Sequence, residues 1–139
     1  MNKKILVISP FAPYKTVKHA GGQIHYYYVN KIAQDNAVTL ISFANISEKV
    51  AVEKDGINCR SFICYEKSGF SSLSEFVRKL IVFWWYKNPF NKYGGIVNYQ
   101  FKLFLLKTVK LLVKENYSPD YILFDWIQSS FFIKNIKKV

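Results

Sequence analysis

Hydrophobic residues along this chain form continuous runs that alternate with stretches of helical spacing. Lys4 to Ser9 (KILVIS) and Val38 to Phe43 (VTLISF) are continuous aliphatic runs, which are typical of strands buried on both faces of a parallel sheet. Residues 23–35, which lie between these runs, predict a helix because apolar side chains recur at helical spacing. Its expected apolar stripe consists of Ile24, Tyr28 and Ile32.

The same alternation continues to the end of the chain. Further strands are expected at Asn58 to Tyr65 and at Tyr121 to Trp126 (YILFDW). Helices are expected at residues 46–54, 71–88 and 97–116, the last with Lys107, Lys110 and Lys114 on one face and five apolar residues on another. These five are Phe101, Phe104, Leu105, Val109 and Leu112.

This order of elements predicts an α/β fold. Repeated strand-helix units with nearly continuous apolar strands favour a Rossmann-like, doubly wound and mostly parallel sheet, in a three-layer sandwich. We expect one domain over residues 1–139, because no linker, repeat or low-complexity tract is visible. The helical pattern after Trp126 has barely made three turns at Val139, so we also expect the domain to be part of a longer protein.

Composition excludes several classes of protein. Half of the residues are hydrophobic and 25 are aromatic, which excludes a disordered chain. The longest uncharged apolar run, Leu80 to Tyr86, is far shorter than the ~20 residues of a membrane-spanning helix. The apolar stretch at the N-terminus is also too short for a secretory signal. A cytoplasmic protein is therefore expected, with a net charge of +11.

Cys59 and Cys64 are expected to be reduced thiols. Five positions apart in one strand, they point to opposite faces at a separation of about 16 Å, too far for a disulfide bond. A C-x4-C pair without a nearby His or second Cys pair is also a poor zinc site. We therefore expect no metal, with at least one of the two thiols in the core.

Candidate chemistry gathers where two expected strands end. In open α/β sheets, ligands bind beyond the carboxyl ends of the strands. The first strand leads into residues 10–22, a loop that ends in Gly21-Gly22. Two hypotheses for this pair stay open: a backbone approach to an anion, or a loop that needs positive φ. Asp125 lies at the end of the last expected strand and either caps the next helix or acts on a sugar hydroxyl, by orienting it or by accepting a proton.

Several familiar sites are not supported. Residues 20–25 read AGGQIH, which fits neither a dinucleotide fingerprint nor a P-loop. The second strand ends without an acidic residue for a ribose, so a nicotinamide or flavin dehydrogenase is disfavoured. His19 and His25 have no carboxylate nearby in sequence and are expected to be partly exposed. Ser9 lacks the G-x-S-x-G setting of a hydrolase nucleophile.

The segment of residues 76–93 mixes basic and aromatic side chains. Arg78, Lys79 and Lys87 alternate with rings such as Trp85, a mixture typical of the boundary between water and lipid. Contact with an anionic membrane surface is one hypothesis, and a buried helix with a solvated basic face is the other. Nucleic acid is the competing polyanion, but no recognisable binding module accompanies these residues.

Residues Ile5 to Phe43 carry a resemblance to a known family. Their sequence is ILVISPFAPYKTVKHAGGQIHYYYVNKIAQDNAVTLISF, which resembles the start of GT-B glycosyltransferases of glycosyltransferase family 4. The shared order is a strand, an S-P-x-x-P-Y type loop, a Gly-Gly pair, a helix ending in an aliphatic-Ala dipeptide and a V-T-L-L-S-F type strand. Ser118-Pro119-Asp120 with YILFDW resembles the P-D-x-V strand of the same family.

The resemblance implies the acceptor-binding half of an enzyme. It covers essentially this whole chain but only the first of the family's two Rossmann-like domains. The family moves a sugar from a nucleotide-sugar donor to an acceptor, here a glycan or a lipid-linked acceptor, and its second domain grips the nucleotide through an E-x7-E type motif. Members that act on lipid-linked acceptors often rest a basic, aromatic surface on the membrane.

Carried over by position, the resemblance implies a set of site residues. Asp125 would be catalytic, although many members have His there. No cofactor or metal is expected besides the donor, no nucleic acid partner is expected, and membrane contact would use Arg78, Lys79, Trp85 and Lys87. The substrate-binding residues would be Pro10, Gly21, Gly22, Gln23, His25 and Trp126.

Three functions remain open from the sequence. The first is this acceptor domain, which by itself is expected to be inactive. The second is a non-catalytic Rossmann-like binding module, and the third is a basic domain that binds a membrane surface or another polyanion. Under the first hypothesis, Gly22→Asp or Asp125→Ala is expected to lower transfer by the longer protein while leaving the fold intact.

Overall fold

The computed structural model describes residues 2–65, 80, 99–125 and 133–136. Within these ranges the chain alternates between strands and helices. The strands are β1 (Lys4–Ser9), β2 (Ala37–Ala44), β3 (Arg60–Tyr65) and β4 (Tyr121–Phe124). The helices are α1 (Ala20–Asp35), the 3-10 turn η1 (Ile46–Glu48), α2 (Lys49–Asp55), α4 (Tyr99–Lys114) and α6 (Ile133–Ile136).

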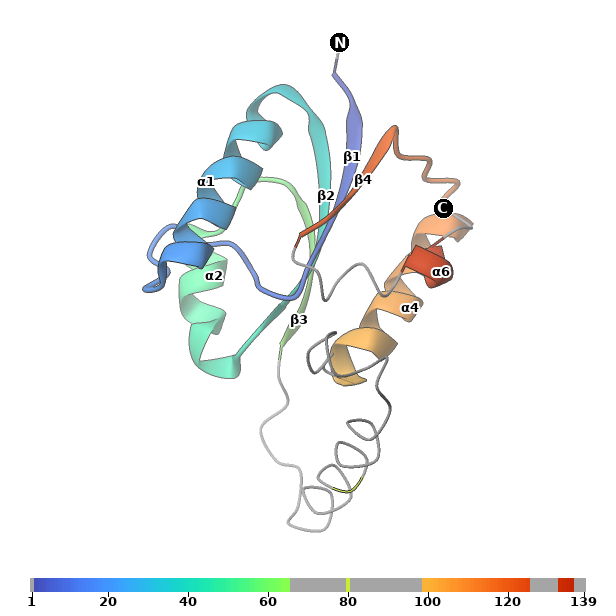
Figure 1. The fold of residues 1–139 in the computed structure, drawn as a ribbon. Coiled ribbons are helices and arrows are strands. Elements are labelled where there is room, and N and C mark those ends of the chain that lie inside the picture. The colour runs from blue at the N-terminus through green and yellow to red at the C-terminus, as the bar shows by residue number, and fades with distance from the viewer. Residues whose placement is uncertain (1, 66–79, 81–98, 126–132, 137–139) are drawn as a thin grey trace, which may run out of the picture.

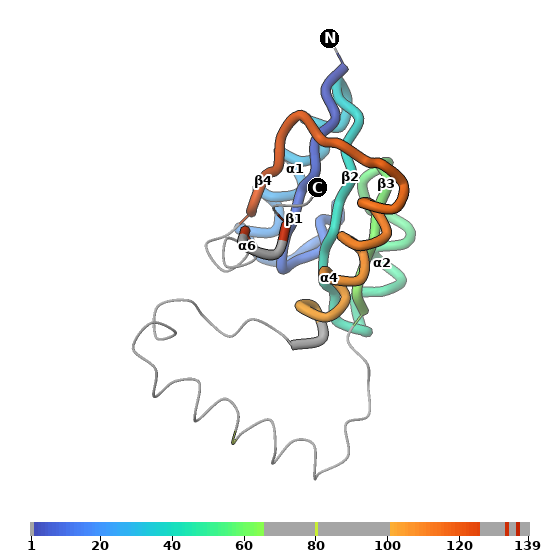
Figure 2. Tube along the Cα trace, turned by 90° about the vertical axis from the view of Figure 1, so that its right-hand side faces the viewer, coloured from blue at the N-terminus to red at the C-terminus, as the bar shows by residue number. Residues whose placement is uncertain are grey.

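The four strands form one parallel sheet. Their order is β3-β2-β1-β4, so β1 pairs with β2 on one side and with β4 on the other. Figure 2 shows this order across the sheet. In register, Ile8 of β1 lies beside Ile41 of β2 and Phe124 of β4. All carboxyl ends therefore lie at the same edge of the sheet.

Helices cover both faces of the sheet. Helices α1 and α2 lie on one face, and α4 and α6 on the other (Figure 1). Alternate residues of a strand point to opposite faces. Thus Leu6 and Ile8 pack in one core cluster with Leu105 of α4, whereas Ile5 and Val7 pack in another with residues of α1. Two buried faces explain the continuous aliphatic run in β1.

The expected α/β class is confirmed, and β1 has the bounds that its sequence predicts. The short helical segment at residues 46–54 is found as η1 and α2, and the helix expected at residues 97–116 is found as α4. The expected helix at residues 71–88 lies outside the described residues except for Leu80.

The apolar stripe predicted for α1 is wrong at Ile24 and confirmed at Tyr28 and Ile32. Ile24 is 68% exposed, whereas the buried residues of α1 are Gly22, His25 and Val29. Tyr28 and Ile32 do pack against the cluster around Val29. The helix starts at Ala20 rather than at Gln23, and Gly22 and His25 are the residues of its first turns that are buried.

The two cysteines lie on opposite sides of the sheet. Cys59 packs with the cluster that includes Val29, and buried Cys64 belongs to the cluster that includes Phe101. This arrangement is the one predicted from their odd spacing. Burial raises the pKa of the Cys59 thiol, which keeps it in the unreactive protonated form.

Candidate functional site

The candidate site lies where the strand order of the sheet reverses. The chain runs from β1 through β2 to β3 in one direction, and β4 then pairs with the other side of β1. Ligands of open α/β sheets bind beyond the carboxyl ends of the strands at such a point. Ser9 ends β1 and Asp125 follows β4, and the Asp125 amide donates to the Ile8 carbonyl at 2.9 Å. The two strand ends predicted to carry chemistry are therefore adjacent.

The Asp125 carboxylate is surrounded by side chains from β1 and α1. The Ser9 hydroxyl donates to Asp125 Oδ2 at 3.3 Å, and His25 Nδ1 lies 2.9 Å from the same oxygen. The Tyr28 hydroxyl also hydrogen bonds to Asp125. Three groups thus hold this carboxylate in one place.

Burial and charge act together on Tyr28. Desolvation, the negative charge of Asp125 and the hydrogen bond to Asp125 raise the pKa of the phenol to about 12. Each cause disfavours a phenolate beside a carboxylate. Tyr28 is therefore a neutral donor at every physiological pH.

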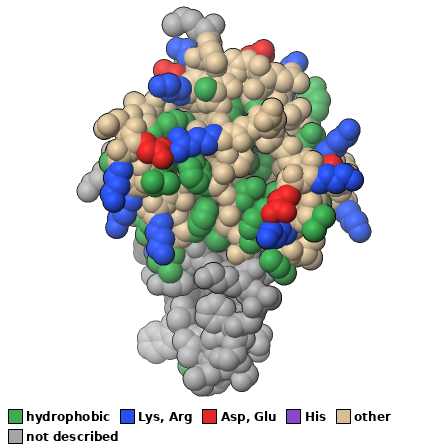
Figure 3. All heavy atoms as spheres, turned by 180° about the vertical axis from the view of Figure 1, so that it is seen from behind, with side chains coloured by type: hydrophobic (Ala, Val, Ile, Leu, Met, Phe, Trp, Pro, Cys, Tyr) green, Lys and Arg blue, Asp and Glu red, His purple; other side chains and the backbone are tan. Residues whose placement is uncertain are grey.

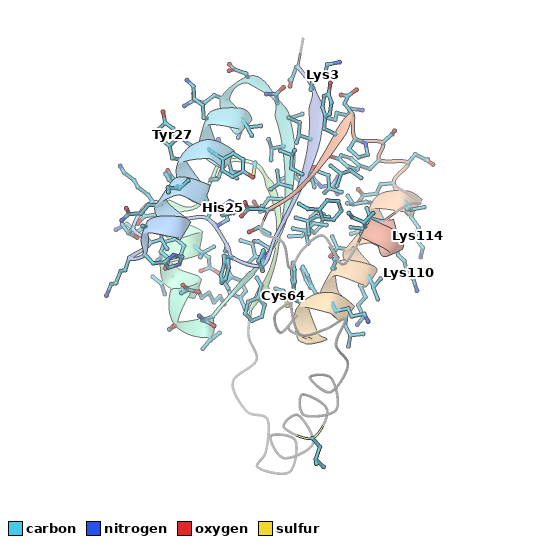
Figure 4. The ribbon with its side chains drawn as sticks, in the orientation of Figure 1. Lys3, His25, Tyr27, Cys64, Lys110 and Lys114 are labelled. Atoms are coloured by element: carbon cyan, nitrogen blue, oxygen red, sulfur yellow. The ribbon has the colours of Figure 1, made fainter. Side chains whose placement is uncertain are left out.

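His25 is a buried side chain of the site. Its side chain is only 2% exposed, against 16% for that of Asp125. Figure 4 shows His25 pointing from α1 toward the sheet and Tyr27 pointing away from it. The expectation that His25 is partly exposed is wrong. His25 does have a carboxylate neighbour, Asp125, which is distant in sequence but adjacent in the fold. With this burial, His25 is placed to orient Asp125 rather than to reach a ligand directly.

The first turn of α1 is capped by its own chain. His19 is the N-cap residue, and its Nδ1 accepts from the Gly22 amide at 2.9 Å. The Gln23 amide donates to the His19 carbonyl, and Gln23 Nε2 donates to the Val17 carbonyl at 3.2 Å. The backbone N–H of Gly22 is therefore occupied, and an anion would have to displace His19 to use it.

Close packing explains why residue 22 is a glycine. A Cβ at this position would lie 2.6 Å from Val17 Cγ2 and 2.7 Å from His19 Cε1. Gly22 lies in the helix, so the hypothesis of a loop position with positive φ is wrong. We therefore expect Gly22→Asp to disturb the packing of this turn as well, because the Cβ of an aspartate would collide with both side chains.

The structure places the remaining predicted residues separately. Pro10 is half-buried directly after Ser9, Gly21 is half-buried in the first turn of α1, and Gln23 is exposed. Trp126 lies outside the described residues, as do the predicted membrane contacts Arg78, Lys79, Trp85 and Lys87. Of the predicted site residues, the structure brings Asp125 and His25 into contact.

Three residues of the site were missed from the sequence. Ser9 was considered only as a nucleophile, yet it is a buried donor to Asp125. Tyr28 was assigned to the apolar stripe, and His19 was not recognised as a helix cap. For Tyr28, a signal was present in the sequence. His25, Tyr28 and Val29 stand at positions i, i+3 and i+4, which places these three residues on one helix face.

Within residues 2–65, 80, 99–125 and 133–136, no three His, Cys, Asp or Glu side chains come together as a metal-binding group. No helix among these residues has the length and apolar character needed to cross a membrane.

Comparisons with known proteins give no relative: no family model, no curated protein and no solved structure matches this chain.

Proposed function

We propose that this chain is the acceptor-binding domain of a GT-B glycosyltransferase. In this proposal, the complete enzyme transfers a sugar from a nucleotide-sugar donor to a glycan or a lipid-linked acceptor. The observation that carries it is the Asp125 carboxylate, held by Ser9, His25 and Tyr28 at the switch point of a parallel sheet. The resemblance of residues 5–43 and 118–126 to glycosyltransferase family 4 supplies the reaction class.

Asp125 would act on the acceptor hydroxyl. That hydroxyl donates a hydrogen bond to the carboxylate, its oxygen attacks the anomeric carbon, and its proton passes to Asp125 as the new C–O bond forms. The bond between the anomeric carbon and the phosphate oxygen breaks, and the nucleoside diphosphate leaves with the bonding electrons. A positioned carboxylate contributes by orientation and by general base catalysis.

The side chains around Asp125 suit this role. Ser9, His25 and Tyr28 come from two different elements, so the carboxylate is fixed by packed parts of the fold rather than by a loop. A catalytic group held in one geometry needs little reorganisation as charge develops. The Asp125 side chain is also the more exposed partner of the His25–Asp125 pair, which leaves it the more accessible of the two to an acceptor.

The test is glycosyl transfer by the protein made from its complete reading frame. It would be incubated with UDP-, GDP- and TDP-sugars and a membrane extract that supplies lipid-linked acceptors, and products would be identified by mass spectrometry. We expect transfer from at least one donor and a loss of about 10²- to 10⁴-fold in Asp125→Asn, the range of one general base.

Asp120→Asn is the matched control. Asp120 precedes β4 at the opposite edge of the sheet, where its carboxylate accepts from the Lys4 amide. The same change in charge and size there is expected to leave transfer within about twofold of the original rate. Equal rates for Asp125→Asn and the unaltered protein, or the absence of transfer from every donor, would overturn the proposal.

A non-catalytic binding module is the second candidate. It is favoured by the topology alone, because ligands bind beyond the carboxyl ends of parallel strands whether or not they react there. Calorimetric titration with the same nucleotide sugars distinguishes the two functions. Tight binding without any transfer supports a binding module, whereas transfer that depends on Asp125 supports the enzyme.

A further inference from the structure

Helix α4 differs in charge from the other long helices of the described chain. Its lysines are Lys102, Lys107, Lys110 and Lys114, and its sequence contains no acidic residue. By contrast, α2 balances Lys49 and Lys54 with two acidic residues, and α1 balances its lysine with an aspartate. Among these three helices, an unbalanced excess of four positive charges is therefore found in α4 alone.

These lysines face solvent. Lys107, Lys110 and Lys114 are exposed, and Figure 4 shows Lys110 and Lys114 pointing away from the sheet. None of the four lysines of α4 forms an ion pair with another described residue. Figure 2 shows α4 in front of the sheet, so the face that carries these lysines is an outer surface of the described residues.

The same outer face is unusually apolar between its lysines. Leu103 is 44% exposed, Leu111 43% and Val113 40%. The inner face already has its own apolar residues, Phe101, Leu105, Val109 and Leu112, which are buried against the sheet. The exposed leucines are thus additional to those that hold α4 in place.

Charge and apolarity together identify one kind of partner. Four cations without a counter-charge are complementary to an anionic surface, and each lysine near an anionic bilayer strengthens binding by about fivefold. Leucine and valine among the cations suit acyl chains below a headgroup layer. Phosphates of a nucleic acid would use the lysines but not the leucines. Seen from behind, basic side chains stand at both margins of the molecule (Figure 3).

We propose that the outer face of α4 docks on an anionic phospholipid bilayer. The lysines would lie at the level of the phosphates, with Leu103 and Leu111 reaching the acyl boundary. This surface is separate from residues 76–93 and from the Asp125 site, so the proposal does not depend on glycosyl transfer.

The test is cosedimentation of the full chain with vesicles. Vesicles of 30% phosphatidylglycerol in phosphatidylcholine would be compared with pure phosphatidylcholine at 0.1 M and 0.5 M salt. We expect binding to the anionic vesicles only. Lys107→Gln with Lys110→Gln is expected to weaken binding roughly 30-fold, from about fivefold for each lysine.

The control removes the same charge from the other face of the sheet. Lys31→Gln with Lys54→Gln alters exposed lysines of α1 and α2 and is expected to weaken binding less than threefold. Leu103→Gln with Leu111→Gln is expected to abolish the binding that persists at 0.5 M salt. All six positions are on exposed surface, and thermal unfolding would verify that each variant is folded.

Two results would overturn the proposal. In the first, both lysine pairs weaken binding equally, which would make the effect one of net charge. In the second, the leucine pair has no effect and a 20-nucleotide single-stranded RNA displaces the vesicles, which would assign the surface to nucleic acid. Absence of binding to anionic vesicles would also overturn the proposal.

Discussion

Tyr28 makes the stability of this protein sensitive to alkaline pH. Its pKa is raised from 10 to about 12 in the folded chain, so the folded state keeps a proton that the unfolded state releases above pH 10. The stabilisation is complete below pH 10 and is lost as pH rises toward 12. From pH 9 to 11 we expect Tyr28 to lower the unfolding free energy by about 1 kcal/mol, after allowance for solvent screening.

Urea unfolding at pH 9 and pH 11 measures this loss. Tyr28→Phe should show a smaller decrease between the two pH values than the unaltered chain. Tyr27→Phe is the control, because Tyr27 is 71% exposed on the same helix and should leave the decrease unchanged. The assignment fails if the two phenylalanine variants respond to pH alike.

Gly22 tests whether close packing fixes the start of α1. An alanine there gains about 1 kcal/mol of helix propensity, but its Cβ meets Val17 and His19 at under 3 Å. Overpacking of this kind costs roughly 1–3 kcal/mol, and Val17 is buried. We expect Gly22→Ala to lower the urea midpoint, and Gly21→Ala, which gains the same helix propensity, to raise it. If Gly22→Ala is instead more stable than the original, Val17 and His19 move aside at little cost in free energy.

Individual site residues were predictable, but their contacts were not. Asp125 was identified because an acid at the end of an apolar strand is unusual, and the topology of the sheet explains its place beside Ser9. Those two residues are 116 positions apart, so no local pattern links them. Tyr28 stands in a run of three tyrosines, and only the exact phase of α1 shows which ring faces the sheet.

At the scale of elements, α1 depends on an unusual cap. His19 accepts from the Gly22 amide through Nδ1, a role more often filled by Ser, Thr, Asp or Asn. We expect His19→Ala to lower the unfolding free energy by about 1 kcal/mol and His19→Asn to restore most of it. Thermal unfolding measures both. If the alanine variant is as stable as the original, the cap contributes nothing.

Helix α4 depends on burial instead. Leu105 is fully buried against the sheet, whereas Leu103 on the same helix is 44% exposed. Leu105→Ala is expected to cost about 2–5 kcal/mol, and Leu103→Ala less than about 0.5 kcal/mol. Urea unfolding of the two variants compares the same substitution on opposite faces. Similar losses would mean that the helix does not pack as described.

These two helices show what periodicity predicts. For α4, repeated Leu and Phe at helical spacing identified the buried face, because burial alone determines which side faces the sheet. For α1, the sheet-facing turn contains His25 and Gly22 instead of aliphatic residues, so the hydrophobic pattern pointed to Ile24. The helix start was missed for the same reason, since two glycines and a histidine are weak helix signals.

For the whole molecule, the excess of positive charge opposes folding. The chain has a net charge of +11, and the described residues contain two ion pairs with Lys or Arg, both on exposed side chains. Salt screens the repulsion among the many lysines more than it weakens these few attractions. We therefore expect the melting temperature to rise when sodium chloride is increased from 20 to 300 mM.

A less charged variant separates screening from other effects of salt. Changing Lys107, Lys110 and Lys114 to Gln removes three charges and lowers the formal net charge from +11 to +8. If repulsion is the cause, this variant melts at a higher temperature than the original at 20 mM and gains less from added salt, because fewer repulsions remain to be screened. If chloride instead binds at a specific site, added salt raises the melting temperatures of both proteins equally. If attractive ion pairs outweigh the repulsion, added salt lowers both melting temperatures.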